Sequence, residues 1–129
     1  MRLRFKCKEC GKTYPLDSLN YKCSCGGLFN LEGKQPGIVD TELSLGEVET
    51  PVLQRDLAGQ PVYLKLDYLM PTGSFKDRGA VVMIDQLAKN GVKEIVEDSS
   101  GNAGAAVAAY AAAANINCRI FLPADTSEG

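Results

Sequence analysis

The chain has 129 residues, of which 45% are hydrophobic and 23% are charged, a composition typical of globular domains. It contains no histidine, which excludes a Ser-His-Asp triad, a Cys-His dyad and an HExxH zinc site. A net charge of -2 and a pI near 5.1 argue against a general affinity for nucleic acid. Any catalysis must therefore use other side chains or a cofactor.

Charge and cysteine content divide the chain into regions of different character. Residues 1–34 carry seven Lys or Arg and three Asp or Glu, a net +4, whereas residues 35–129 carry seven and thirteen, a net -6. Four of the five cysteines lie in the first 25 residues. We therefore expect a small module at 1–34, a linker and lead-in segment at 35–60 that begins near Gly33–Gly37, and a third region at 61–129.

No segment has the pattern of a membrane span or a signal peptide. The longest apolar stretch, Ala103 to Ala114, is well short of the ~20 residues that cross a bilayer, and no apolar run follows the basic start of the chain. The sequence predicts a cytoplasmic protein without membrane partners. In that reducing compartment, paired cysteines more often bind metal than form disulfides.

The N-terminal cysteines have the spacing of a zinc ribbon. They form a C-x2-C pair and a C-x-C pair twelve residues apart, and glycine follows each pair; the four are Cys7, Cys10, Cys23 and Cys25. Glycine permits the tight turn that brings two thiolates to one ion. We expect a structural zinc ion, with short strands at Thr13-Tyr14 and Leu19–Lys22.

Other interpretations of this module stay open. The four cysteines could be free thiols or form two disulfides, and the C-x-C pair is one residue shorter than usual. A zinc ribbon that binds nucleic acid or another partner is the alternative function. Four thiolates around Zn²⁺ would lower the net charge of the module to about +2, which makes nucleic acid the weaker hypothesis.

Alternating strand and helix patterns begin at residue 61. Val62–Leu66 is a β-rich run, and Ser74 with Asp77 has the spacing of a capping box before a helix. The helix carries an apolar stripe at helical period and ends at Asn90-Gly91; the stripe is Ala80, Val81, Ile84, Leu87 and Ala88. These features predict the first strand and the first helix of an α/β unit.

The second half of this region repeats the pattern. Glu94–Glu97 reads as a strand, Ala103–Ala114 is a helix with nine alanines in twelve residues, and Cys118–Leu122 reads as a third strand. The crossovers are long enough for parallel strands. The expected fold class is α/β with a parallel three-layer sheet, preceded by the zinc-ribbon-like module.

Two loops of this region could hold a ligand, because in parallel sheets ligands bind where strands lead into helices. Lys76 is expected in the first turn of its helix, where the helix dipole disfavours an ammonium, so the amine could form a Schiff base. The alternative is a solvated lysine paired with Asp77. The Ser99–Asn102 turn offers amide donors at a helix start, an anion-binding arrangement.

Four motifs carry a resemblance to a known family. PTGSFKDRG at Pro71–Gly79 and SSGNAGAAVAAYAA at Ser99–Ala112 resemble the pyridoxal-phosphate enzymes of fold type II, related to the β-subunit of tryptophan synthase. LGEVETP at Leu45–Pro51 and FLPAD at Phe121–Asp125 resemble, in the same order, the threonine synthase family. Cysteine synthases and serine or threonine dehydratases resemble one another and this chain in the two central motifs, but each family has its own version of them. The versions in this chain are most similar to those of the threonine synthase family.

The resemblance implies a site and a reaction. Lys76 would be the catalytic residue that forms the Schiff base with pyridoxal 5'-phosphate, Asn102 would bind the 3'-oxygen of the cofactor, and Phe75 and Asp77 would position the lysine. The substrate carboxylate would be held by Ser99, Ser100, Gly101 and Ala103. The implied activity is a carbon-oxygen lyase of threonine biosynthesis that converts O-phospho-L-homoserine and water to L-threonine and phosphate. Another fold type II enzyme acting on a hydroxy- or phospho-amino acid is the alternative.

The family also implies a longer polypeptide. Its chains run to several hundred residues, and the glycine-rich loop that holds the cofactor phosphate comes well after the second motif. We therefore expect this chain to be an N-terminal fragment, inactive alone, whose partner is the remainder of the enzyme chain or a second copy in a homo-oligomer.

Overall fold

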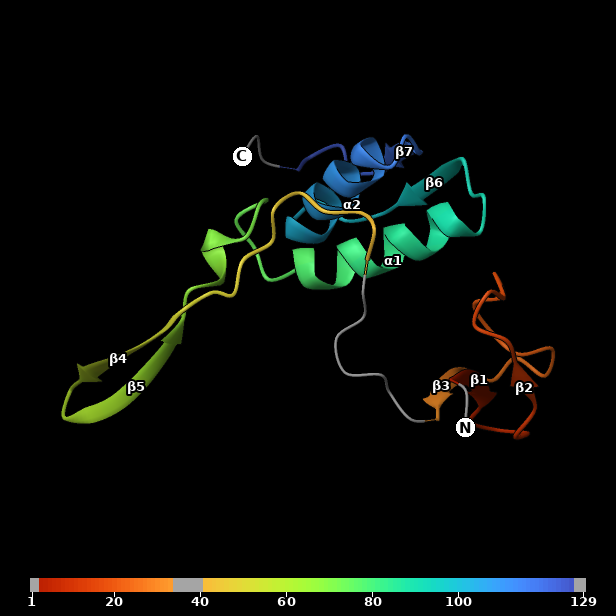
Figure 1. The fold of residues 1–129 in the computed structure, drawn as a ribbon, viewed down its shortest axis with the longest axis horizontal. Helices are drawn as coiled ribbons and strands as arrows, with labels where there is room; N and C mark the ends of the chain where they lie inside the picture. The colour runs from red at the N-terminus through yellow and green to blue at the C-terminus, as the bar shows by residue number, and fades with distance from the viewer. Residues whose placement is uncertain (1–2, 34–40, 127–129) are drawn as a thin grey trace. The chain divides into compact units, whose positions relative to one another are not determined.

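The computed structural model describes residues 3–33 and 41–126, and Figure 1 shows its ribbon. The chain divides into two compact units, residues 1–40 and residues 41–129. Apart from Gly33, the linker predicted at Gly33–Gly37 lies outside the described residues. The region boundaries expected at residues 34 and 60 stay predictions.

The first unit is a small antiparallel sheet. Its strands are β1 (Arg4–Cys7), β2 (Thr13–Tyr14) and β3 (Phe29–Glu32), in the order β2-β1-β3. The strand predicted at Thr13-Tyr14 is confirmed. The strand predicted at Leu19–Lys22 is wrong, because β1 takes β3 as its second neighbour and leaves those residues outside the sheet.

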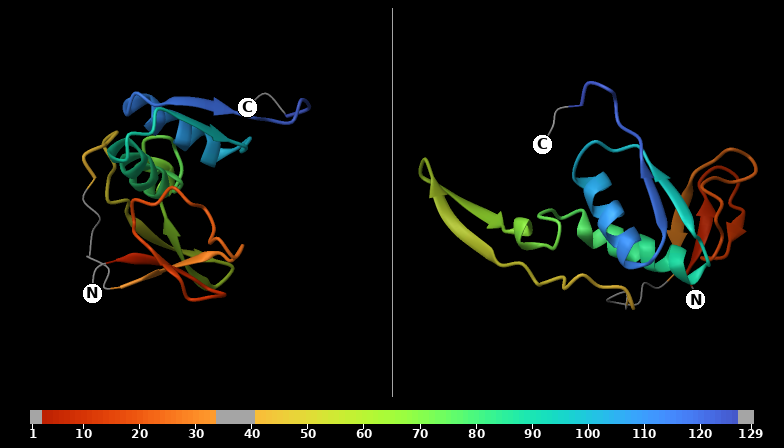
Figure 2. Two further views of the ribbon diagram at one scale, coloured as in Figure 1. Left: turned by 90° about the vertical axis from the view of Figure 1, so that its right-hand side faces the viewer. Right: turned by 90° about the horizontal axis from the view of Figure 1, so that it is seen from above.

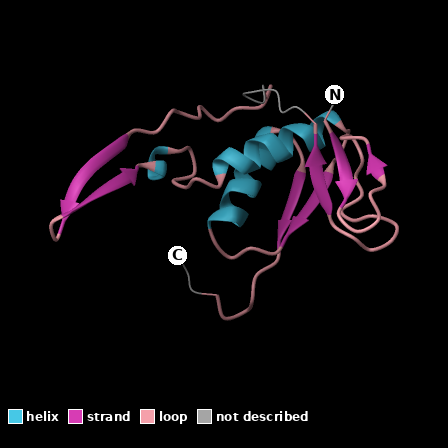
Figure 3. Ribbon diagram, turned by 90° about the horizontal axis from the view of Figure 1, so that it is seen from below, coloured by secondary structure: helices cyan, strands magenta, loops and turns pink. Residues whose placement is uncertain are grey.

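The second unit begins with a β-hairpin. β4 (Val52–Leu57) and β5 (Gln60–Lys65) pair antiparallel around Ala58 and Gly59, which both have positive φ, as a two-residue hairpin turn requires. Figure 3 shows these strands as an arm separate from the two helices. Val62–Leu66 was expected to be the first strand of the parallel sheet. That expectation is wrong, since the tight turn pairs this segment with the strand before it.

The α/β part follows the hairpin through a 3-10 turn, η1 (Asp67–Leu69). Its elements are α1 (Asp77–Lys89), β6 (Glu94–Glu97), α2 (Asn102–Ala113) and β7 (Asn117–Ile120). β6 and β7 are parallel neighbours, so α2 is the crossover between them. This confirms the predicted second strand and second helix, and the third strand starts one residue before Cys118.

The predicted apolar stripe of α1 packs with residues of α2 in one hydrophobic core. Ile84, Tyr110 and Ala111 are fully buried, and Val107 and Ile116 are nearly so. Small alanine side chains on α2 let the two helices approach closely. α1 ends as expected, with Asn90 as its C-cap and Gly91 at a φ of 75°.

The expected three-layer sheet is not present in the part of the chain that the structure describes. The parallel sheet has two strands there, and both helices lie on the same side of it (Figure 2). Ile95 and Cys118 face the helix layer and pack against its core. Val96 and Phe121, by contrast, are 62% and 59% exposed. Among the described residues, the second unit is mixed α/β, with its helices and its parallel strand pair in two layers.

Candidate functional site

The two predicted ligand loops lead into the same end of the helix pair. Residues 71–76 precede α1, and residues 98–101 join β6 to α2. Figures 1 and 3 show the first turns of α1 and α2 side by side. The structure therefore brings Lys76 and Asn102, which are far apart in sequence, to the same end of the helix pair.

Asp77 organises the first loop. Its carboxylate is fully buried and accepts hydrogen bonds from the Thr72 hydroxyl and, at 2.7 Å, from the Thr72 N–H. The predicted capping box does not form, because α1 begins at Asp77 and the Ser74 hydroxyl accepts instead from the Lys76 N–H at 3.2 Å. Asp77 therefore folds the loop back on the helix start rather than capping it.

Lys76 is exposed and its amine has no ion-pair partner among the residues that the structure describes. Its Nζ lies 5.0 Å from the ring centroid of the exposed Phe75. The alternative that Lys76 pairs with Asp77 is wrong, since both carboxylate oxygens of Asp77 bind Thr72. The amine is therefore accessible to a ligand.

The second loop leaves the start of α2 open. Gly101 is the N-cap in extended conformation, no side chain caps the helix, and its first turn carries no acid. Asn102 and Ser100 are exposed, and Ala103 is half-buried. The Ser99 hydroxyl accepts a hydrogen bond from the Gly101 N–H at 3.4 Å. An uncapped helix start attracts anions through its N–H groups and its dipole.

Gly104 lets this loop lie against the helix. A Cβ at this position would be 2.2 Å from the Ser99 carbonyl oxygen, closer than any real contact. Only glycine therefore permits the close approach of the Ser99 backbone to α2. Gly104 was not among the predicted site residues. A glycine inside an otherwise alanine-rich helix is the sequence feature that could have indicated a close backbone contact.

A polar cluster that sequence reasoning missed joins the hairpin to α1. The Asp67 carboxylate accepts from Thr50 at 2.5 Å and from the Arg78 guanidinium at 2.9 Å, and Arg78 also donates to Thr50. These bonds hold the pKa of Asp67 below its usual range, chiefly through Arg78 and then Thr50. Because the partners are 11 to 28 residues apart, local spacing could not reveal the cluster.

Glu47 forms a second contact that sequence reasoning missed. Its carboxylate accepts from the Ser44 hydroxyl at 2.5 Å, the Leu45 N–H at 3.0 Å and the fully buried Tyr110 hydroxyl at 2.5 Å. Burial opposes ionisation, yet the three donors lower the pKa of Glu47 to about 2. Burial, followed by the hydrogen bond to Glu47, raises the pKa of Tyr110. The pair fastens the segment before the hairpin to α2.

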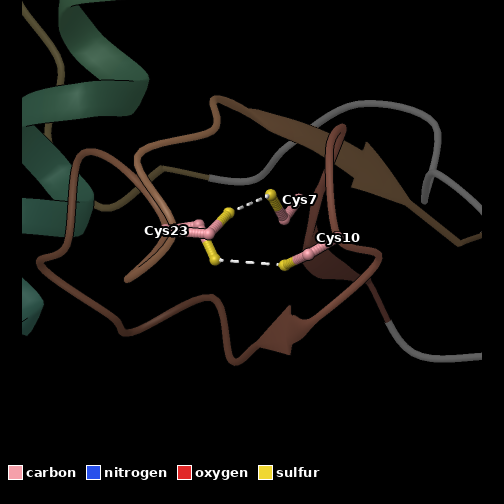
Figure 4. Close-up of side chains that lie close together, drawn as sticks. Cys7, Cys10 and Cys23 are labelled. Atoms are coloured by element: carbon pink, nitrogen blue, oxygen red, sulfur yellow. Dashed lines mark hydrogen bonds between the residues drawn. The ribbon is translucent and has the colours of Figure 1, made fainter.

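The first unit holds a cluster of four sulfurs. The Sγ atoms of Cys7, Cys10, Cys23 and Cys25 all lie within 4.8 Å of one another. The Cys7 and Cys25 sulfurs are 3.5 Å apart and the Cys10 and Cys23 sulfurs are 3.6 Å apart. Figure 4 shows the side chains of Cys10 and Cys23 turned toward each other. None of these cysteines forms a disulfide. The cluster could hold a metal ion.

Two similar turns bring the sulfurs together despite their different lengths. In the first turn, the Cys7 N–H donates to the carbonyl five residues later, at Lys12; in the second, the Cys23 N–H donates to the carbonyl four residues later, at Gly27. Gly11 and Gly26 have positive φ in the two turns. The C-x-C pair therefore forms the same kind of turn as the C-x2-C pair, one residue shorter.

The surroundings of the sulfurs favour thiolates at two positions. The Cys25 N–H and then the Tyr14 hydroxyl lower the pKa of Cys23 to about 6, and the Cys10 N–H lowers the pKa of Cys7. The Gly27 N–H favours the thiolate of Cys25, but its three neighbouring sulfurs raise the pKa of Cys25 to about 12. A cation at the centre would remove this repulsion between thiolates.

Comparison with known proteins agrees with the family that the motifs of the two ligand loops resemble. The profile of pyridoxal-phosphate dependent enzymes matches residues 36–129. The chain belongs to this family. Its similarity to the threonine synthases of fold type II begins before the matched region and reaches into the cysteine-rich module, because alignments to threonine synthases cover up to 92% of the chain.

Three relatives show the range of this similarity. The threonine synthase of Methanocaldococcus jannaschii is 33% identical over 92% of this chain and 37% of its own length, and that of Methanosarcina acetivorans is 32% identical over 92% and 36%. A human serine dehydratase-like protein is 42% identical over 62% of this chain and 26% of its own. The chain thus spans about a third of the length of the curated relatives it matches.

The helices give no sign of a membrane span. In residues 3–33 and 41–126, no helix is both long enough and apolar enough to cross a bilayer.

Proposed function

We propose that this chain contributes to a pyridoxal-phosphate-dependent lyase that converts O-phospho-L-homoserine and water to L-threonine and phosphate. The observation that carries the proposal is the accessible amine of Lys76, the residue before α1, whose first turn lies beside the uncapped start of α2 (Figure 1). The similarity to two archaeal threonine synthases over 92% of the chain supports the choice of reaction.

The residues at this end of the unit fit the cofactor that the family uses. Lys76 offers a primary amine that pairs with no acid in the described part of the chain, and the buried Asp77 holds the loop that precedes it. Asn102 offers an exposed amide at the first residue of α2, next to the amine-bearing loop. When bound, the cofactor supplies an electron sink for the carbanion that forms on loss of the α-proton. Lys76 is the group placed to accept and return that proton.

The start of α2 is the proposed carboxylate site. Ser99 and Ser100 offer hydroxyls there, and Ala103 offers a backbone N–H group that no capping side chain occupies. The Gly101 N–H, which donates to the Ser99 hydroxyl at 3.4 Å, would turn to the carboxylate. Glu47 adds a negative charge to the second unit, but the side chain is bound by three donors of the protein and is not available to the substrate. This arrangement suits an amino-acid substrate whose carboxylate lies at the helix start.

The alternative is another fold type II enzyme, acting on a hydroxy- or phospho-amino acid. The similarity to the human serine dehydratase-like protein is the observation that favours it. O-phospho-L-homoserine and L-serine share the amino and carboxyl groups, so the site described here would accept the common part of both. The two hypotheses differ in whether the phosphate of the substrate improves binding.

Absorption spectroscopy of the full chain tests the proposal. Titration with pyridoxal phosphate is expected to give a protein-bound absorption band, and Lys76→Ala is expected to abolish it. Lys93→Ala is the matched control, because Lys93 is also exposed and lies outside both loops. O-phospho-L-homoserine should shift the band at lower concentrations than L-serine. Equal binding by Lys76→Ala would contradict the cofactor site, and a preference for L-serine would favour the alternative.

We also propose zinc as the ion for the four-cysteine cluster. Thiolates are soft ligands that zinc binds tetrahedrally at about 2.3 Å, which places the four sulfurs about 3.8 Å apart. The two pairs at 3.5 and 3.6 Å are already near this spacing. Four sulfur ligands leave no open position, so the ion would be structural. Free thiols suit a reducing compartment, and we accordingly propose a cytoplasmic location.

A further inference from the structure

The first unit has almost no apolar core. Among residues 3–33, the buried positions are Cys7, Cys23 and Gly27, so the sulfur cluster itself occupies the centre. Most of the large apolar side chains of this unit are exposed, by 36 to 79%; they are Leu16, Leu19, Tyr21, Leu28 and Leu31. Burial of apolar surface therefore contributes little to the stability of this unit.

The other side-chain contacts among residues 3–33 involve groups near the surface of the unit. Phe29 stacks on Phe5 at 5.6 Å and contacts Tyr14 at 4.9 Å, but none of these rings is buried. The ion pairs join Arg4 and Lys6 to one partly exposed acid, Glu32. Exposed pairs of this kind contribute at most about 1 kcal/mol each. They cannot offset the conformational entropy of ordering about 30 residues, which costs about 1–2 kcal/mol per residue for the backbone alone.

The packing around the sulfurs is, by contrast, close. A Cβ at Gly27 would be 2.7 Å from the Cys7 sulfur and 2.7 Å from Cγ of Glu9. The Tyr14 hydroxyl lies 3.2 Å from the Cys23 sulfur and also accepts the Ser24 N–H at 3.1 Å. The sheet and both cysteine turns therefore converge on the place where the ion would sit.

We infer that the metal ion folds the first unit: residues 3–33 are ordered with zinc bound and unfold on its removal, while the second unit stays folded. This inference rests on the proposed zinc site. Zinc binding would supply the folding free energy that the missing core cannot. The second unit has its own core around Ile84 and Tyr110 and needs no metal for it. The two units would thus lose their structure separately.

Hydrogen exchange of the full chain, read by mass spectrometry, tests this inference. The chain is prepared under reducing conditions, its zinc content is measured, and exchange is compared with zinc and with a chelator. Chelation is expected to speed exchange more than about tenfold in residues 3–33, including the Lys8 and Cys23 amides that bond to Leu28 and Gly27. Exchange in α1 and α2 should not change, and added zinc should restore protection.

Matched cysteine variants separate the possible failures. Cys10→Ser removes one ligand and should weaken zinc binding and protection, whereas Cys118→Ser, outside the cluster, should behave as the parent chain. Co²⁺ in place of zinc should give the absorption of a tetrahedral thiolate site. Protein that binds no stoichiometric zinc would overturn the zinc site itself. Stoichiometric zinc with unchanged protection after chelation would overturn only the folding inference.

Discussion

At the scale of single residues, the candidate site depends on positions that hold a backbone in place rather than on reactive groups alone. Asp77 is fully buried so that Thr72 can fold over the start of α1. Gly104 has no side chain so that Ser99 can lie against α2. Lys76 and Asn102, which would meet the ligand, are both exposed. The reactive side chains are thus free because neighbouring residues fix the two loops.

Gly104→Ala tests this account at one position. The new methyl group would lie 2.2 Å from the Ser99 carbonyl oxygen, so the loop must move. We expect a loss of about 1–3 kcal/mol in the free energy of unfolding, together with weaker binding of pyridoxal phosphate. Urea unfolding followed by the helical circular dichroism signal measures the first effect, since the α-helices of the described residues belong to the second unit.

Gly79→Ala is the matched control for this substitution. A Cβ at Gly79 would meet no atom within 4 Å, and the residue lies in the first turns of α1. Alanine there should leave stability unchanged or raise it by up to about 1 kcal/mol. If both variants lost the same stability, the close approach of the Ser99 carbonyl to Gly104 would not be the reason that position 104 requires glycine.

Several candidate site residues could be singled out from sequence because their motifs are local. The pattern around Lys76 and the pattern around Asn102 each occupy fewer than fifteen consecutive residues. The contacts of Glu47 and Asp67 could not be predicted, because their partners Tyr110 and Arg78 lie 63 and 11 residues away. Local spacing carries no information about which distant side chain completes such a hydrogen bond.

At the scale of elements, the helices followed their sequence patterns more closely than the strands did. The apolar stripe of α1 and the alanine run of α2 have a periodicity or propensity of their own. The sequence of the strand at Val62–Leu66 does not indicate which strand it pairs with. The Ala58-Gly59 turn pairs it with β4. In the first unit, β1 and β3 were not predicted, because 21 residues separate the two strands in sequence. The stacking of the Phe5 and Phe29 rings, which links the strands, is visible only in the structure.

Acid unfolding tests the contact between the segment at Glu47 and helix α2. The pKa of Glu47 is lowered from 4.5 to about 2 in the folded chain. Because the folded state binds a proton less readily than the unfolded state, the contribution of this carboxylate is full at neutral pH and is lost as the pH falls from about 5 to 2. Glu47→Gln should therefore be less stable than the parent by about 1–3 kcal/mol at pH 6, and the difference should narrow at pH 3.

Urea unfolding of both chains at the two pH values makes this measurement. Some pH dependence will remain in Glu47→Gln, because the pKa values of Asp67 and Asp85 are also lowered. Glu49→Gln, two residues away and exposed, should match the parent chain at both pH values. A stability difference for Glu47→Gln that is equal at pH 6 and pH 3 would contradict the role assigned to its hydrogen bonds.

At the scale of the whole molecule, two compact units with different interiors share one chain. The first unit surrounds a sulfur cluster, and the second packs two helices on a parallel strand pair. The expected third layer is not found in the described residues, and Val96 and Phe121 are exposed on the uncovered side of the strands. The distribution of charge and cysteine predicted regions of different character but could not show how many layers would cover the sheet, because layer number depends on long-range packing.

The central claim is that this chain carries the lysine that binds pyridoxal phosphate in its family. The most direct test adds pyridoxal phosphate to the full chain, reduces with borohydride, digests the protein and locates the modified residue by mass spectrometry. The account predicts stoichiometric modification at Lys76, with the other lysines, including the exposed Lys93, modified only in trace amounts. Modification spread evenly over the exposed lysines, or concentrated on a residue other than Lys76, would contradict it.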